Sequence, residues 1–357
     1  MPRFQSLQDR SVPTAVWLAG VALLVMAMVV VGGITRLTES GLSITEWAPV
    51  SGALPPLSDA EWNRQFDAYR QTTQYAQLNA GMSLEAFKGI FWWEWAHRLL
   101  GRLIGLAFAL PFFGLLYLGQ IPKRLVWRCW VLLGLGGLQG AVGWWMVVSG
   151  LAGRVEVAPE RLTVHLGLAL IIFVGLVWTA LEAGFGEDHS RSPAGWSRGA
   201  AGLLALVFVQ CLLGGLVAGN DAGRVFTDWP MFEGRWSPPV DWTLGAAAFL
   251  HDQGLVQLMH RLGAYALFLA SLVFLIQTLR WRLADRVPTA AMALFGAVLI
   301  QALLGIATLM TALNPWLAGL HQAGGVIVLG LATALLWLVR RSQPRLFMSS
   351  AMSARAL

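Results

Sequence analysis

The feature that most constrains this chain is a series of apolar runs, each about 20 residues long, which recur along almost its whole length. A helix of that length crosses the roughly 30 Å hydrocarbon core of a bilayer. The chain is 57% hydrophobic and 12% charged, whereas soluble domains carry about 25% charged residues. The sequence therefore predicts an all-α polytopic membrane protein with eight spans, at about 14–34, 92–118, 127–148, 162–181, 199–218, 255–279, 289–311 and 316–339.

The basic residues predict the orientation of the chain. They number 25 against 19 acidic residues, but they lie in short segments between apolar runs, which favours a topological role over nucleic-acid binding. The side that holds both termini carries 14 basic residues, whereas the side with the two longest loops, at about 35–91 and 219–254, carries eight. Because basic segments stay inside, we expect cytoplasmic termini. The first apolar run is typical of a signal anchor without a transit peptide, which favours a bacterial inner membrane.

The two halves of the chain repeat each other. Matching residues recur at offsets of 156 to 182, in the pairs Gly32-Gly33 and Gly214-Gly215, Glu46-Trp47 and Asp228-Trp229, His97-Arg98 and His260-Arg261, and His165 and His321. Each half has four spans, so the second half keeps the orientation of the first. We expect two tandem four-helix bundles, 1–183 and 184–357, related by a pseudo-two-fold axis along the membrane normal.

Four histidines lie at similar depth near the outer ends of the even-numbered spans, namely His97, His165, His260 and His321. An imidazole in the hydrocarbon region is costly without a partner, and interhelical hydrogen bonding is the simplest explanation for one such residue. A pair in each half instead favours haem, because two facing helices can hold an iron from both sides. Zinc is less favoured, since a tetrahedral site needs three or four ligands together.

Glu94 precedes His97 by three residues, so the two side chains share one helix face. The matching residue before His260 is Gln257. A buried carboxyl group can exchange protons with a reacting group, whereas an amide cannot. We therefore expect Glu94 to be catalytic and the first half to hold the reaction site. A structural carboxylate, satisfied by Arg98 or a loop amide, is the alternative.

Two arginines follow histidines of the predicted sites. Arg98 and Arg261 lie near the outer interface, where a guanidinium can bind haem propionates through two hydrogen bonds. Snorkelling toward the headgroups is the other interpretation. The glycine pairs of the repeat are interpreted as sites where helices pack closely.

The residues Gly32-Gly33-Ile34-Thr35-Arg36-Leu37-Thr38-Glu39-Ser40-Gly41-Leu42-Ser43, then Trp47, Pro49, Gly52, Pro55-Pro56 and Glu94-x-x-His97-Arg98, resemble the haem A synthase family. The resemblance covers nearly the whole chain. It implies an enzyme that oxidises the C8 methyl of haem O to the formyl group of haem A, the cofactor of terminal cytochrome oxidases. It implies that His97 and His165 flank the iron of haem O beside Glu94, and that His260 and His321 bind the iron of haem b, with both sites near the periplasmic side.

Some members of that family carry a cysteine pair in the first outer loop. This chain has only Cys129 and Cys211, both in apolar runs, so it resembles the proteobacterial and mitochondrial-like branch. A haem O-producing farnesyltransferase, cytochrome oxidase assembly factors and a homo-oligomer are candidate partners. Two other readings remain open. A non-catalytic di-haem cytochrome b that accepts electrons from quinol leaves Glu94 unexplained, and a transporter predicts polar residues nearer the middle of the membrane.

Overall fold

The computed structural model describes residues 10–186, 194–281, 283 and 286–341. His189 and five of the terminal-side arginines, Arg3, Arg191, Arg282, Arg345 and Arg355, lie outside these ranges. The described residues form no strand, and their eight longest helices are apolar enough to cross a membrane. These are α1 (Val12–Leu37), α4 (Leu84–Tyr117), α5 (Lys123–Leu151), α6 (Pro159–Phe185), α7 (Ala194–Gly219), α9 (Gln253–Arg280), α10 (Arg286–Met310) and α11 (Pro315–Arg341). The predicted all-α, eight-span membrane fold is confirmed.

Each of the eight long helices begins earlier than its predicted span, and polar residues cap the first turns of α1, α4 and α9. Ser83 is the N-cap of α4 and accepts a hydrogen bond from the backbone N–H of Ala86. Asp252 caps α9 in the same way through Leu255. The added first turns of α4 carry Phe87 and Phe91, which are buried against the outer loop and not in the bundle.

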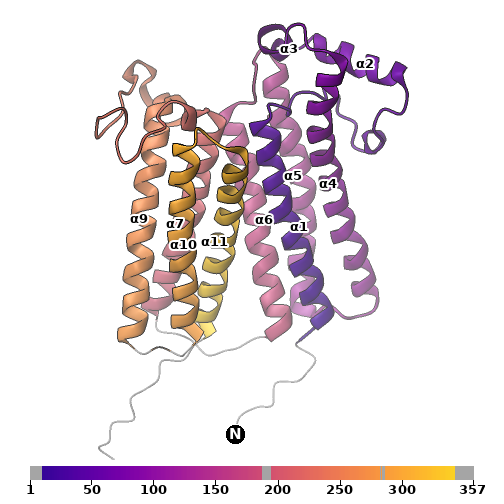
Figure 1. Cartoon of the computed structure of the whole chain (residues 1–357). Coiled ribbons are helices and arrows are strands. Elements are labelled where there is room, and N and C mark those ends of the chain that lie inside the picture. Colours follow the sequence, from indigo (N-terminus) through magenta and orange to yellow (C-terminus); the bar gives the residue numbers. More distant parts are fainter. Residues whose placement is uncertain (1–9, 187–193, 282, 284–285, 342–357) are drawn as a thin grey trace, which may run out of the picture.

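Each half is a ring of four helices with the same order of contacts. In the first half α1 and α5 each pack against both α4 and α6, and in the second half α7 and α10 each pack against both α9 and α11. The two members of α4/α6, and of α9/α11, are therefore diagonal to each other across a bundle core. The halves meet where α6 contacts α7 and α11 and where α1 contacts α11 (Figure 1).

The second glycine of each repeated pair lies at the contact between the halves. A side-chain carbon at Gly33 would overlap Gln322 of α11, and one at Gly215 would stand 3.0 Å from Leu166 of α6. These residues follow His321 and His165 directly in the sequence. The expectation that the glycine pairs allow close helix packing holds for these two positions.

The two long loops lie at the same end of the bundle, opposite the start of α1 and the end of α11 (Figure 1). The first loop folds into η2 (Ser51–Ala53), α2 (Asp59–Arg70) and α3 (Thr73–Leu78), and an aromatic cluster of Trp62, Phe66, Tyr69, Phe87 and Phe91 joins it to α4. The second loop contains η3 (Ala222–Arg224), η4 (Trp242–Ala247) and α8 (Ala248–His251). Burial of large aromatic side chains thus fixes the first loop above the candidate site.

Candidate functional site

The four histidines come from the diagonal helices of each half. His97 lies on α4 and His165 on α6, whereas His260 lies on α9 and His321 on α11. Because each pair of helices faces across a bundle core, the side chains of a pair approach one another from opposite sides. The rings of His260 and His321 have centroids 6.3 Å apart and are nearly perpendicular, at 87°.

That spacing suits two opposed ligands of one metal. Metal–nitrogen bonds of about 2 Å on either side of a metal ion place the centroids of two imidazoles about 6 Å apart. Within the described ranges no group of three or more His, Cys, Asp or Glu side chains is placed to hold a metal ion. The arrangement therefore offers two ligands per half, as an axially bound haem requires and a tetrahedral zinc site does not.

Each imidazole lies against a glycine of a neighbouring helix. A side-chain carbon added at that glycine would stand only 2.8 to 3.3 Å from the ring, in the pairs Gly32 and His97, Gly143 and His165, Gly214 and His260, and Gly305 and His321. The glycines obey the repeat, at offsets of 182 and 162. At all four positions the absence of a glycine side chain leaves space for an imidazole, and for Gly32 and Gly214 this agrees with the prediction that the pairs allow close helix packing.

Sequence reasoning missed three glutamines that contact the histidines. Each donates its amide Nε2 to an imidazole Nδ1, in the pairs Gln139 and His165 at 3.2 Å, Gln210 and His260 at 3.0 Å, and Gln301 and His321 at 3.0 Å. The same amide also donates to the backbone oxygen of that histidine. The signal was present, because each is a polar residue within an apolar run and Gln139 and Gln301 are related by the repeat.

Glu94 is buried and its carboxylate accepts four hydrogen bonds. Oε2 accepts from Ser43 Oγ at 2.7 Å and from the backbone N–H of Ile44 at 2.8 Å. Oε1 accepts from Nε and Nη2 of Arg98, at 3.1 and 2.7 Å. Arg98 and a loop amide, the partners named in the sequence-based alternative, therefore both bind the carboxylate, and they fix its position.

Gln257 takes the same place in the second half with opposite hydrogen-bond polarity. Its Nε2 donates to the backbone oxygen of Phe226 at 2.9 Å. Phe226 is related to Ile44 by the offset of 182, and Ile44 presents its N–H to Glu94. The first loop thus suits a carboxylate, because it presents a backbone N–H donor, whereas the second loop suits an amide, because it presents a backbone oxygen acceptor.

Both arginines of the predicted site bind loop carbonyls. Arg98 donates to the backbone oxygens of Ile44 and Glu46, at 2.7 and 2.9 Å. Arg261 donates to the backbone oxygens of Asp228, Pro230 and Met231, at 2.8 to 3.2 Å. Each guanidinium therefore fastens the outer loop of its own half to the helix that carries the preceding histidine.

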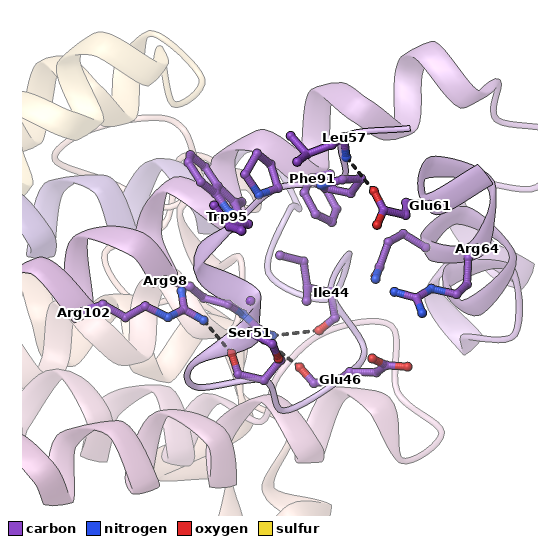
Figure 2. A pocket seen from close by; sticks show the side chains of 16 residues that line it. Ile44, Glu46, Ser51, Leu57, Glu61, Arg64, Phe91, Trp95, Arg98 and Arg102 are labelled. Atoms are coloured by element: carbon purple, nitrogen blue, oxygen red, sulfur yellow. Dashed lines mark hydrogen bonds between the residues drawn. The ribbon is translucent and has the colours of Figure 1, made fainter. Parts of the chain in front are cut away.

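A pocket of about 330 Å³ lies between the first outer loop and α4. Figure 2 shows Arg98 and Arg102 extending from α4 on one side of the pocket and Glu61 and Arg64 of α2 across from them. Phe91, Trp95 and the Pro-rich loop also line the pocket. Arg102 donates to the backbone oxygens of Ala48 and Pro49, both at 2.8 Å. Arg98 thus borders the pocket and also holds Glu94.

Fold and site together define a class: a polytopic membrane protein with two histidine pairs, each within its own four-helix bundle. Residues 15–333 match the model of the cytochrome oxidase assembly protein family, COX15-CtaA, and the chain belongs to that family. It is 57% identical over 335 residues to the haem A synthase of Caulobacter sp. (strain K31) and 53% identical to that of Caulobacter vibrioides, with 93% of this chain and 98% of each relative covered. Its identity to the haem A synthase of Bradyrhizobium diazoefficiens is 49%, over 88% of both chains.

The resemblance noted from the outer-loop motif is thus confirmed, and so is the prediction of an oxidoreductase enzyme in haem A biosynthesis. The glycine clearances, the paired imidazoles and the 6.3 Å spacing of one pair fit a haem held from both sides. The buried Oε1 atoms of Gln139, Gln210 and Gln301 have no hydrogen-bond partner among the described residues, which leaves acceptors beside three of the four histidines.

Proposed function

We propose that this protein oxidises the C8 methyl of haem O to the formyl group of haem A. The observation that carries the proposal is the pair of diagonal histidines in the first half, His97 and His165, with Glu94 on the helix of His97. The relatives named haem A synthase support the reaction, because they are similar to this chain over nearly its whole length.

The two halves divide the work. Residues 1–183 form the substrate half, in which His97 and His165 flank the iron of haem O. Residues 184–357 form the haem b half, in which His260 and His321 are the axial ligands. The contrast between Glu94 and Gln257 supports this division, because the carboxylate three residues before His97 can accept a proton, whereas the amide three residues before His260 cannot.

Haem b supplies one-electron redox chemistry when it is bound. The protein's own residues supply position and electrostatics. Glu94 accepts a proton as the methyl is oxidised, or orients the incoming water, through Oε1 or Oε2. Arg98 and Ser43 keep the carboxylate in place, so little reorganisation is needed when charge develops.

The site lies near the periplasmic face of the bacterial inner membrane, with both termini in the cytoplasm. The excess of basic residues on the terminal side supports this orientation. The outer loops, joined to α4 and α9 by Arg98 and Arg261, then cover the outer ends of the two sites. Haem O arrives from a farnesyltransferase, and haem A passes to oxidase assembly factors.

Extraction of the pigments from the purified protein tests the proposal. We expect haem b together with haem O or haem A, identified by chromatography and by their pyridine haemochrome spectra. Haem b alone would contradict the proposal in favour of a di-haem cytochrome b. A protein without any haem, when expressed in cells that make haem O, would contradict both and favour a transporter.

A further inference from the structure

The glutamine contacts are distributed unequally between the four histidines. In the second half each histidine has a glutamine, because Gln210 contacts His260 and Gln301 contacts His321. In the first half Gln139 contacts His165. At the position related to Gln210 by the offset of 182, the chain has Met28. No described residue forms a hydrogen bond with the His97 imidazole, and a thioether donates none and accepts only weakly.

The residues around these glutamines also differ between the two halves. A side-chain carbon at Gly263 would overlap Oε1 of Gln210, and one at Gly324 would overlap Oε1 of Gln301. Each of these glycines lies three residues after a histidine of the second half, where the first half has Leu100 and Leu168. In the second half, therefore, each helix that carries a histidine also carries a glycine, and this glycine leaves space for the glutamine amide of the neighbouring helix.

An amide at this position suits an imidazole that binds iron. A histidine that binds through Nε2 keeps its proton on Nδ1, and that N–H needs an acceptor. The Oε1 atoms of the three glutamines are buried without a partner in the described part of the chain, so rotation of an amide presents an acceptor to Nδ1–H. His321 Nδ1 already lies 3.1 Å from the backbone oxygen of Gln301, a second acceptor.

We propose that Gln139, Gln210 and Gln301 are positioning residues that fix the imidazoles of His165, His260 and His321, and that His97 is left without such a contact so that its bond to the substrate haem can exchange. This inference rests on the proposed function. A resident cofactor needs two fixed ligands, whereas a substrate that enters and a product that leaves need one ligand that releases. The second half has two glutamine-bound histidines and the first half has one, which matches those needs.

Haem transfer from the full-length protein in detergent to apomyoglobin tests the second-half contacts. For Gln210→Leu and Gln301→Leu we expect haem b to transfer about 10 to 100 times faster than from the wild type, the range typical of lost second-shell contacts. The low-spin electron paramagnetic resonance signal of haem b should shift as well, because the imidazole planes are no longer fixed. Gln210→Glu, which keeps an acceptor for Nδ1–H, should retain haem b.

Gln277→Leu is the matched control, because Gln277 is exposed on the same helix as His260 and should leave transfer and spectrum unchanged. Wild-type transfer rates and spectra in Gln210→Leu and Gln301→Leu would overturn the proposal. So would altered thermal stability with an unchanged haem b spectrum, since that result indicates a structural role only.

Met28→Gln tests the first half by supplying the missing contact. We expect haem O or haem A to transfer to apomyoglobin about tenfold or more slowly than from the wild type. Unchanged transfer would refute the role assigned to His97. If His260→Ala still holds haem b, the proposed function fails; if it loses haem b while the glutamine variants behave as the wild type, only this inference fails.

Discussion

Arg98 donates a hydrogen bond from Nη2 to Oε1 of Glu94 over 2.7 Å, and the two residues lie one helical turn apart on α4. The same guanidinium binds the backbone oxygens of Ile44 and Glu46 in the outer loop. Arg98 thus connects the carboxylate to the first outer loop. In the second half, Arg261 binds the second outer loop in a similar way. The position of the Glu94 carboxylate therefore depends on this loop as well as on the helix.

Glu94→Gln should abolish formyl production while both haem sites stay occupied. An amide keeps the size of the side chain but cannot accept a proton, and loss of a general acid or base costs about 10²–10⁴-fold in rate. The haem O and haem A contents of cells expressing the variant, measured by chromatography, report the effect. Glu85→Gln is the control, because Glu85 lies exposed on the same helix and forms an ion pair with Lys88 at the surface. Wild-type haem A output in Glu94→Gln would refute the catalytic assignment.

His260→Ala should deplete haem b and leave the substrate haem in place. An iron that loses one of two axial imidazoles is bound far less firmly, and the two histidine pairs belong to separate helix rings. His97→Ala should have the reverse effect, with haem b retained. Quantification of each haem in the purified variants checks both expectations. Equal loss of both haems in either variant would contradict two independent sites.

Gly305→Ala should weaken haem b binding, whereas Gly296→Ala on the same helix should not. A methyl group at Gly305 would stand 2.8 Å from Cε1 of His321, but one at Gly296 would meet nothing within 4 Å. Overpacking of this kind costs about 1–3 kcal/mol, whereas alanine in an open helix position gains up to about 1 kcal/mol. Haem b content and thermal unfolding in detergent distinguish the two variants. Full haem b content in Gly305→Ala would show that the ring needs no clearance there.

Arg36 joins the two halves at their outer ends through two carboxylates. Its Nη2 lies 2.6 Å from both Glu156 Oε2 and Asp221 Oδ2. Burial is the largest influence on Glu156 and, with the nearby Asp221, raises its pKa above the usual value in spite of Arg36. The folded state therefore binds a proton at Glu156 more tightly than the unfolded chain, and this residue favours folding less as the pH rises through its raised pKa.

Arg36→Gln should destabilise the protein most at high pH. Without the guanidinium the two carboxylates repel each other, and we expect the free energy of unfolding to fall by about 1–3 kcal/mol at pH 8. This is less than the cost of breaking a fully buried ion pair, because these groups are partly exposed. Protonation of Glu156 removes the repulsion, so the difference in melting temperature from the wild type should shrink toward pH 5. Arg224→Gln is the control, since Arg224 is half-exposed and more than 3.5 Å from its acidic partners. A difference independent of pH would contradict the assignment.

The sequence was sufficient to predict the helices, because they depend on local pattern. Eight apolar runs of spanning length require eight helices in a bilayer, and matching residues at offsets of 156 to 182 predict a duplication. The helix ends were less accurate: α4 begins at Leu84, eight residues before its predicted start, because its first turns pack against a loop cluster and not against lipid.

Several contacts of the candidate site could not be predicted. Gln139 and His165 are 26 residues apart in sequence, and Gln210 and His260 are 50 apart, so their contacts depend on which helices are neighbours. The clearance at Gly143 is a property of the distance between α5 and α6, which no spacing along the chain reveals. The loop carbonyls bound by Arg98 and Arg261 were missed for the same reason.

By itself, the sequence determined that this chain has eight apolar runs of membrane-spanning length, that matching residues recur in its two halves and that Glu94 precedes His97 where Gln257 precedes His260, since hydropathy, spacing and residue type can be read along the chain. Only the tertiary structure decided that each histidine pair lies on diagonal helices, that Glu94 is held by Arg98 and that His97 lacks the glutamine given to the other three. Those relationships depend on how helices far apart in the chain pack together.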